Sequence, residues 1–284
     1  MRFIESPRNP LVRNLRALHR NRARRLQQQF LIEGMRLLEE AMASGCRVDT
    51  ILYCAEAISD SRTEDLLSKC KNNGVLVIPA SRAVVASVSE TETSPGLIAM
   101  VHQPQAPEII TIVGRTDLAI LCDQIQDPGN AGTIIRTAEA ASAGGVFLTG
   151  GSVYPFSSKV IRSSMGSLFR LPIRLLADDG CRLCNLCLDK GWQLVFGVPG
   201  QGVPWWQVDF TLPTLLVLGN ESAGINKNLL ELPATKTTIC IAPQVDSLNV
   251  AIAGAVLLFE AVRQRTANNL EFPQNVITYR EKGL

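Results

Sequence analysis

After Asp117, six short segments of the sequence are mainly apolar, and helical patterns separate most of them. Strands of this composition are buried on both faces, as in a parallel sheet that helices cover on each side. The expected strands span 118–122, 146–148, 173–175, 193–196, 215–218 and 237–241, and the expected helices span 131–143, 157–166, 181–190 and 248–265. The pattern therefore predicts an α/β domain with a parallel sheet.

The residues before this sheet follow a shorter alternation of helices and strands. Asn9-Pro10 reads as a helix start, with Asn9 as the N-cap. Further helices are expected at 35–43, 63–72 and 81–87, with strands at 50–53, 75–78 and 97–101. Prolines 104 and 107 favour a linker. We expect a small N-terminal α/β domain over 1–103, a linker over 104–116, the parallel-sheet domain over 117–266 and a polar tail over 267–284.

Arginine is concentrated at the N-terminus. Residues 1–25 contain eight arginines, no lysine and one acid, Glu5, which is a charge of +7 in a chain whose net charge is +2. A basic segment on a mildly acidic body is typical of nucleic-acid binding, and arginine suits phosphates and stacked bases. The alternative is a solvated helix face. Nucleic acid is the preferred partner of this arm.

The cysteine and hydropathy patterns argue against a secreted, membrane-spanning or metal-binding protein. The chain has eight cysteines but no signal-peptide pattern and no apolar run of about 18 residues, so we expect reduced thiols, a cytoplasmic location and no membrane span. Cys181, Cys184 and Cys187 have a spacing that iron–sulfur and zinc sites use. No second such pair follows and the chain has two histidines, so we expect packing on a helix face and no metal.

Polar side chains gather at three junctions where an expected strand leads into a helix. The carboxyl ends of parallel strands share one edge of a sheet, so these junctions predict one composite site. The sequence lacks the glycine fingerprint of dinucleotide folds, a P-loop and any histidine after residue 102. Such a site positions groups and stabilises charge, which suits an electrophile that is already activated. The residues at the junctions are Asn130 and Arg136, then Gly219, Asn220 and Glu221, then Ser247 and Asn249, with Ser247 a candidate N-cap of the last helix.

These junctions resemble the motifs of a known family. Residues 130–138 (NAGTIIRTA), 216–225 (LVLGNESAGI) and 241–251 (IAPQVDSLNVA) are similar to the three motifs of the SpoU (TrmH) branch of the SPOUT RNA methyltransferases. Residues 162–166 (RSSMG) also resemble a segment of the family. The stretch from Ser6 to Gly34 resembles its substrate-binding domain, which is like small kink-turn-binding ribosomal proteins. The resemblance covers nearly the whole chain up to about Arg265.

The resemblance implies transfer of a methyl group from S-adenosylmethionine to a ribose 2′-hydroxyl of structured RNA, with ribosomal RNA preferred and transfer RNA possible. It also implies a trefoil knot in the C-terminal domain and a homodimer. The implied catalytic residues are Asn130, Arg136, Glu221, Ser247 and Asn249, and the implied cofactor-binding residues are Leu218, Gly219, Asn220, Ile241 and Leu248. RNA contacts are expected from Arg8, Arg13, Arg16, Arg20, Arg24, Lys159 and Arg162.

Several of these interpretations have alternatives. Asn130 and Ser247 could be helix caps, Glu221 could face a helix N-terminus, Arg136 could form an ion pair, and Lys159 and Arg162 could be solvated surface. A guanidinium hardly ever loses its proton, so we expect a cationic Arg136 that binds phosphate and stabilises the developing alkoxide.

Two aspects of the whole protein also have alternatives. A non-catalytic RNA-binding factor and a base methyltransferase of another branch remain rival functions. In the last helix, Ala251, Gly254 and Ala255 would let a partner helix approach, although the helix could instead be buried in its own domain. Trp205 and Trp206 could serve stacking or packing.

Overall fold

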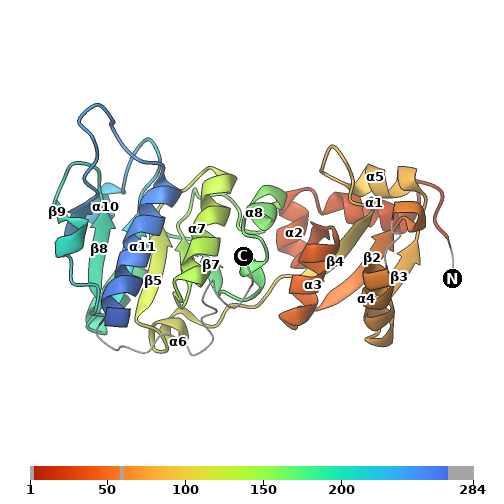
Figure 1. The fold of residues 1–284 in the computed structure, drawn as a ribbon, viewed down its shortest axis with the longest axis horizontal. Helices are drawn as coiled ribbons and strands as arrows, with labels where there is room; N and C mark the ends of the chain where they lie inside the picture. Colours follow the sequence, from red (N-terminus) through yellow and green to blue (C-terminus); the bar gives the residue numbers. More distant parts are fainter. Residues whose placement is uncertain (1–2, 58–60, 268–284) are drawn as a thin grey trace. The chain divides into compact units, whose positions relative to one another are not determined.

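The computed structural model describes residues 3–57 and 61–267 (Figure 1). The predicted polar tail therefore lies outside the described residues, apart from Ala267. The chain forms two compact units, one of residues 1–105 and 154–170 and one of residues 106–153 and 171–284. The boundaries that the sequence predicts for folding domains remain predictions. That residues 154–170 pack with the N-terminal part was not expected.

The first unit is built on a four-stranded sheet with the order β1-β4-β2-β3. Strand β4 is antiparallel to both of its neighbours, whereas β2 and β3 are parallel. Its elements are α1 (Pro10–Ala17), α2 (Asn21–Gln27), β1 (Gln29–Glu33), α3 (Met35–Ala43), β2 (Val48–Tyr53), η1 (Ala55–Ala57), α4 (Ser61–Asn72), β3 (Leu76–Pro79), α5 (Arg82–Val88), β4 (Leu97–His102), α8 (Ser158–Ser163) and η2 (Ser167–Phe169).

The arginine-rich arm is part of the folded core of this unit. Asn9 caps α1, as predicted, because its side chain accepts the N–H of Leu11 and proline occupies the first helical position. Val12 and Leu15 are buried in the same cluster as Leu18. Each such side chain stabilises the fold by ~1.5–3 kcal/mol. Removing residues 1–25 would therefore dismantle the unit, and charge substitutions are the proper test of the arm.

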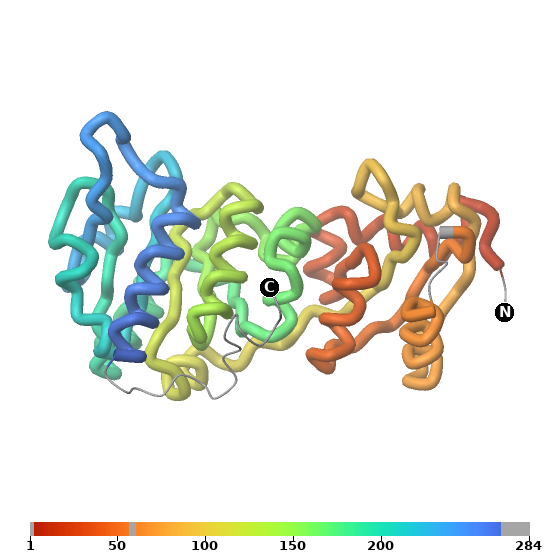
Figure 2. The backbone as a smooth tube through the Cα atoms, viewed as in Figure 1, coloured from red at the N-terminus to blue at the C-terminus, as the bar shows by residue number. Residues whose placement is uncertain are grey.

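Residues 154–170 are held to the first unit by aromatic packing and by a buried arginine. Phe30 of β1 lies 5.3 Å from Phe156 and 6.1 Å from Phe169, measured between ring centroids. Arg24 is 2% exposed, and its Nη2 donates to Ser158 Oγ at 2.6 Å. In Figure 2 this green segment runs beside the red helix α2. The packing explains why α8 belongs to this unit although its sequence follows β6.

The second unit contains a seven-stranded sheet in which every pairing is parallel, as the apolar strands predicted. The strand order is β7-β6-β5-β10-β8-β11-β9. Its elements are α6 (Ile109–Val113), β5 (Leu118–Cys122), α7 (Pro128–Ala140), β6 (Val146–Leu148), β7 (Ile173–Leu175), α9 (Cys181–Asp189), β8 (Gln193–Gly197), β9 (Val203–Pro204), η3 (Trp205–Gln207), β10 (Thr214–Leu218), α10 (Lys227–Leu230), β11 (Thr235–Thr238) and α11 (Val250–Ala267).

Helices cover the sheet of the second unit and pack with it to form the core. Helices α7 and α11 pack against each other on one face, in front of β5 in Figure 1. On the side of α6 and α9, side chains of both helices join Leu121, Phe196 and Val217 in one buried cluster. Cys184 and Cys187 of α9 are fully buried in it, as a packing role predicts, and burial raises the pKa of each thiol to about 12. Such thiols stay protonated near neutral pH.

The last strand and the last helix differ from their predicted limits. Strand β11 ends at Thr238, so Ile239 and Ile241 lie in the following segment, and α11 begins at Val250 rather than at residue 248. Ser247 does not cap the helix. Asn249 does, because its Oδ1 accepts the N–H groups of Ala251 and Ile252 at 2.9 and 3.3 Å.

Candidate active site

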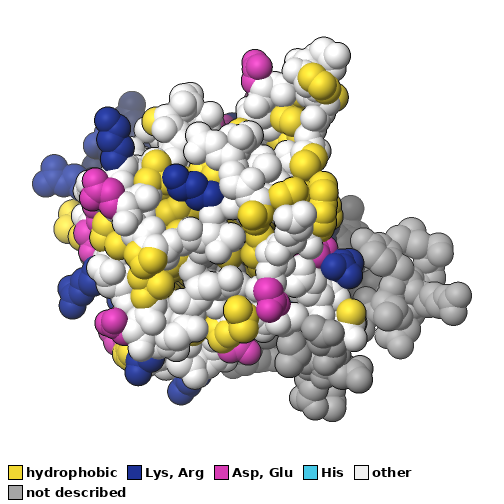
Figure 3. Space-filling view, turned by 90° about the vertical axis from the view of Figure 1, so that its left-hand side faces the viewer, with side chains coloured by type: hydrophobic (Ala, Val, Ile, Leu, Met, Phe, Trp, Pro, Cys, Tyr) yellow, Lys and Arg dark blue, Asp and Glu magenta, His cyan; other side chains and the backbone are white. Residues whose placement is uncertain are grey.

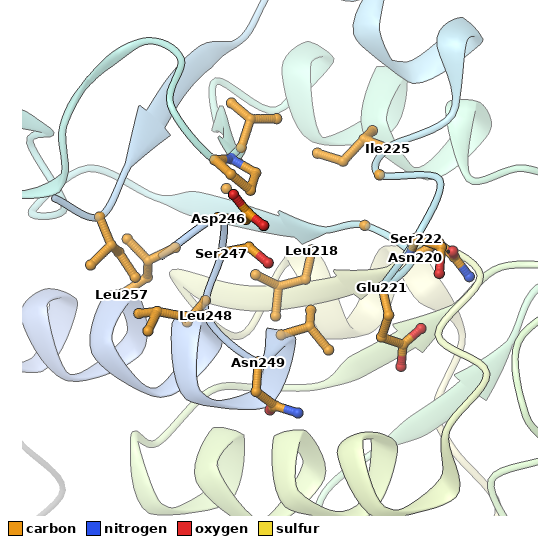
Figure 4. A pocket seen from close by; sticks show the side chains of 18 of the residues that line it. Leu218, Asn220, Glu221, Ser222, Ile225, Asp246, Ser247, Leu248, Asn249 and Leu257 are labelled. Atoms are coloured by element: carbon orange, nitrogen blue, oxygen red, sulfur yellow. Dashed lines mark hydrogen bonds between the residues drawn. The ribbon is translucent and has the colours of Figure 1, made fainter. Parts of the chain in front are cut away.

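A cavity of about 560 Å³ opens at the carboxyl ends of β8, β10 and β11 (Figure 4). Ligands of parallel α/β sheets bind at this edge. The cavity is lined from three directions, by Gly197 at the end of β8, by residues 218–225 at the end of β10 and in the loop that follows, and by the segment that leads from Ile239 into α11. All five residues that the sequence predicts to bind cofactor line it, namely Leu218, Gly219, Asn220, Ile241 and Leu248.

The loop after β10 is rigid because its polar groups are bonded within the protein. Asn220 and Gly224 exchange two backbone hydrogen bonds of 2.9 and 3.0 Å. The Asn220 side chain accepts the N–H groups of Ser222 and Ala223 and donates to the carbonyl of Gln124. The amide of Asn220 therefore shapes the wall of the cavity.

Gly219 is required by contacts within its own loop. A Cβ atom at this position would lie 2.5 Å from the carbonyl carbon of Gly224 and 2.6 Å from the nitrogen of Ile225. The close approach is thus between two parts of the same loop. A side chain would push the loop open, whether or not a ligand were bound.

Asp123 does not line the cavity but supports the loop that does, and the sequence analysis missed it. It follows β5, is 1% exposed, and accepts Thr149 Oγ1 at 2.9 Å and the N–H of Asn226 at 2.6 Å. Burial raises the pKa of this carboxyl, and the two hydrogen bonds oppose the rise. Its bond to Asn226 ties the loop after β10 to β5. An acid directly after an apolar strand is the signal that could have identified it.

Three side chains connect the three predicted junctions. Asn130 Nδ2 donates to Glu221 Oε1 at 2.9 Å, and Asn249 Nδ2 donates to Asn130 Oδ1 at 2.9 Å. Asn130 is not the cap of α7, because Asp127 performs that role by accepting the N–H of Asn130 at 2.8 Å. The Asn130 amide is thus fixed by side chains from the other two junctions, which orients every donor and acceptor in the chain of bonds.

Glu221 is held in its charged form. Burial acts to raise its pKa, but the hydrogen bonds from Asn130 and from the backbone N–H groups of Gln126 and Asp127 outweigh burial and lower the pKa. Glu221 and Ser247 both line the cavity, and Ser247 is exposed. A negative charge therefore stands at the edge of the cavity near neutral pH.

Arg136 lies on α7, six residues after Asn130, and does not line the cavity. Its side chain is exposed and makes no hydrogen bond or ion pair with any residue that the structure describes. The ion pair that was an alternative explanation of Arg136 is therefore absent from the described part of the chain. The structure brings four of the five predicted catalytic residues together and leaves Arg136 facing solvent.

The predicted RNA-binding residues all belong to the first unit. Those on its surface are Arg8, Arg13, Arg16, Arg20, Lys159 and Arg162. Arg24 is the exception and corrects a prediction. It is buried beside Glu90, and Asn21 and Ser158 accept its hydrogen bonds, so its guanidinium is not available to RNA.

Comparison with known proteins identifies the family. Residues 117–259 match the SpoU rRNA methylase family, and residues 9–99 match the MRM3-like substrate binding domain. The chain belongs to the SpoU rRNA methylase family. The predicted family and α/β fold are thereby confirmed. No described helix is long and apolar enough to cross a bilayer, and the described residues contain no cluster of metal-binding side chains.

Individual relatives match along nearly their whole length. An uncharacterized tRNA/rRNA methyltransferase of Synechocystis is 38% identical, over 93% of this chain and 94% of the relative. The 23S rRNA (guanosine(2553)-2′-O)-methyltransferase RlmP of Bacillus subtilis is 31% identical, over 91% and 98%. The crystal structure of the SpoU methyltransferase AviRb from Streptomyces viridochromogenes in complex with AdoMet superposes with a TM-score of 0.83 at 30% identity, over 92% and 99%.

Proposed function

We propose that this protein transfers a methyl group from S-adenosylmethionine to a ribose 2′-hydroxyl of ribosomal RNA. The observation that carries the proposal is the bonded set Asn249, Asn130 and Glu221, which joins three sheet junctions at the mouth of one cavity. Membership of the SpoU rRNA methylase family supports the same chemistry. Relatives that are named as 23S rRNA 2′-O-methyltransferases favour ribosomal over transfer RNA.

The cavity fits the cofactor in size and in the character of its walls. About 560 Å³ lies within the range of small-molecule sites. Leu218, Ile241 and Leu248 offer apolar contacts for an adenine ring, and the loop from Gly219 to Gly224 brings backbone groups to the wall. When bound, S-adenosylmethionine supplies a methyl group on a positively charged sulfur, and that sulfur keeps the electron pair of the broken bond as a neutral thioether.

The chain itself contributes orientation and charge. The methyl group needs no acid for its departure, so the task of the protein is to hold a ribose oxygen in line with it while the hydroxyl proton leaves. Asn130 is locked by Glu221 and Asn249 and can keep its amide in one orientation. Ser247 has an exposed hydroxyl at the cavity that can bond to the ribose.

Arg136 is the residue that we expect to act on the RNA. Its exposed guanidinium has no partner among the described residues, so it is available to an RNA phosphate and to the developing negative charge on the 2′-oxygen. A guanidinium keeps its proton at any pH that the enzyme tolerates. The hydroxyl proton therefore passes to phosphate or water, and a carbon–oxygen bond replaces the carbon–sulfur bond.

RNA binding is proposed for the surface of the first unit. Arg13 and Arg16 of α1, Arg20, and Lys159 and Arg162 of α8 are exposed on one compact body. Arg25 lies 4.8 Å from the ring centre of Tyr154, which ties the arginine-rich helix to the segment that carries α8. Phosphate contacts from these helices would hold structured RNA without reading its sequence.

Nucleoside analysis is the test of this function. Ribosomal RNA from a strain that lacks the protein is incubated with purified enzyme and S-adenosylmethionine, digested and analysed by mass spectrometry. A 2′-O-methylated nucleoside is the expected product. A methylated base would identify another class of methyltransferase, methylation of transfer RNA alone would replace the substrate, and failure of calorimetry to detect cofactor binding would favour a non-catalytic RNA-binding factor.

A homodimer belongs to the proposal. Gly254 does not serve a partner helix, because a Cβ there would lie 2.8 Å from Leu218 of the same chain, and Ala251 is buried as well. The opposite stripe of α11 is exposed, with Ile252 at 52% and Phe259 at 48%. The neighbouring Trp206 is 51% exposed, and Figure 3 shows hydrophobic side chains spread over this end of the second unit.

An exposed apolar stripe of this kind fits a symmetric contact between two copies. Light scattering should give twice the chain mass of 30.9 kDa for the protein, and the Phe259→Asp variant should give the single mass. A wild-type mass near 30.9 kDa would refute the dimer. The trefoil knot and a cytoplasmic location, which accompany the family resemblance, remain part of this proposal.

A further inference from the structure

We propose that Asp246 makes the cavity select the methyl donor over its demethylated product, by placing a negative charge that favours the positively charged sulfur. The inference rests on the function proposed above, because it assumes that S-adenosylmethionine occupies this cavity. It assigns a role to a residue within the third motif, directly before Ser247, that the proposed chemistry of transfer does not use.

The charges around the cavity have one sign. Among the described residues that line it, Glu221 and Asp246 are the acids, and none is a lysine, arginine or histidine. The other polar side chains on the wall are uncharged, such as Asn220, Ser222 and Thr237. A cavity with this lining favours a cation over a neutral molecule of the same shape.

The two acids differ in how far they are engaged by the protein. Glu221 accepts hydrogen bonds from Asn130 and from two backbone N–H groups, which neutralise part of its field. Asp246 makes no hydrogen bond or ion pair with any residue in the described part of the chain. Figure 4 shows its side chain beside that of Ser247, on the segment that leads into α11. Its charge is therefore available to a ligand.

Donor and product differ in one methyl group and in the charge of the sulfur. Both contain an adenine, a ribose, an ammonium and a carboxylate group, but the sulfur is positively charged in the donor and neutral in the product after the methyl group leaves. Asp246 is exposed, so water weakens its attraction for the sulfur to the scale of a surface ion pair. An effect of that scale changes an affinity ratio by roughly two- to fivefold. The same charge helps the product to leave after transfer, since the attraction ends with the reaction.

Calorimetry on three ligands tests the inference without a measurement of activity. The ligands are S-adenosylmethionine, its product S-adenosylhomocysteine, and sinefungin, which has a charged amine in place of the methylsulfonium group. In Asp246→Asn, affinity for the two charged ligands should fall roughly two- to fivefold and affinity for the product should stay unchanged. Unchanged product binding also shows that the cavity is intact.

Two further variants sharpen the test. Asp246→Glu keeps the charge and should restore most of the preference for the charged ligands. Asp189→Asn, at an exposed acid of α9 that does not line the cavity, removes the same net charge and should change none of the three affinities.

The remaining outcomes contradict the inference. If Asp246→Asn weakens all three ligands equally, Asp246 contacts a group that donor and product share. If it weakens none, or if Asp189→Asn has the same effect, the local charge has no role in selection. If the unaltered protein binds none of the three ligands, the proposed function itself fails, which is a separate result.

Discussion

Arg24 in the first unit and Arg136 in the second are both arginines on helices, yet their surroundings differ sharply. Arg24 is 2% exposed, bonds to Asn21 and Ser158 and faces Glu90. Arg136 is exposed and has no partner among the described residues. A buried and paired guanidinium stabilises the fold, whereas an exposed guanidinium without a partner in the protein is available to a ligand. The first should govern stability and the second turnover.

The largest effect is expected for turnover in Arg136→Ala. Loss of the group that we propose to stabilise the developing charge should lower kcat by roughly 10²–10³-fold, while affinity for S-adenosylmethionine stays within a few fold. Arg136→Lys should also be slow, because an ammonium cannot make two parallel contacts. Single-turnover kinetics and calorimetry measure the two quantities, with Arg115→Ala as a control at an exposed arginine of the same unit. Equal losses of turnover and cofactor affinity would place Arg136 in the cofactor site instead.

The reciprocal effect is expected for stability in Arg24→Ala. Removing this side chain leaves the half-buried Ser158 hydroxyl without its donor and removes the Arg24 cation from beside Glu90, which should cost about 1.5–3 kcal/mol in the free energy of unfolding of the first unit. Urea unfolding measures it. Arg22→Ala, at an exposed position on the same helix, should change stability little. If the Arg24 variant has normal stability but binds RNA poorly, Arg24 contacts RNA and its structural role is refuted.

A moderate effect is expected on RNA binding when Arg13, Arg16 and Arg20 are all changed to glutamine. Each lost phosphate contact should reduce the slope of log affinity against log salt by about 0.7–0.9. Binding titrations at several salt concentrations give the slope. Glutamine at Arg115, Arg182 and Lys190 removes the same charge from the surface of the second unit and should leave the slope unchanged. Equal slopes for the two triple variants would mean that the arginines of the N-terminal helices face solvent and do not contact RNA phosphates.

The smallest effect is expected for the contribution of Glu221 to the pH dependence of stability. Its pKa in the folded protein is lowered, so its hydrogen bonds stabilise the fold above the ordinary value of 4.5 and are lost as pH falls through the lowered value. Melting temperatures below pH 4.5 should therefore fall less steeply for Glu221→Gln than for the unaltered protein. Parallel curves for the two proteins would show that Asn130 and the backbone do not hold the carboxylate charged.

Local pattern was enough to predict the elements and much of the site. The apolar strands, the cap at Asn9 and the parallel pairing followed from periodicity, composition and turn chemistry, which act over a few residues. The residues of the three junctions meet because all the strands run in one direction, so their carboxyl ends lie at one edge. That is why Asn130, Glu221 and Asn249 could be grouped before their bonds were known.

Tertiary structure decided the role of each residue whose partners lie far away in the sequence. The sequence could not distinguish buried Arg24 from its exposed neighbours, because its partner Ser158 lies 134 positions away. It gave the wrong cap for α11, and it left open whether Gly254 faces a partner helix or its own domain, where the structure shows a close approach to Leu218 of the same chain. The local sequence pattern determined the helices and strands. Burial, however, depends on which segments pack together. Only the packing therefore determined which charged and small residues make contacts within the protein.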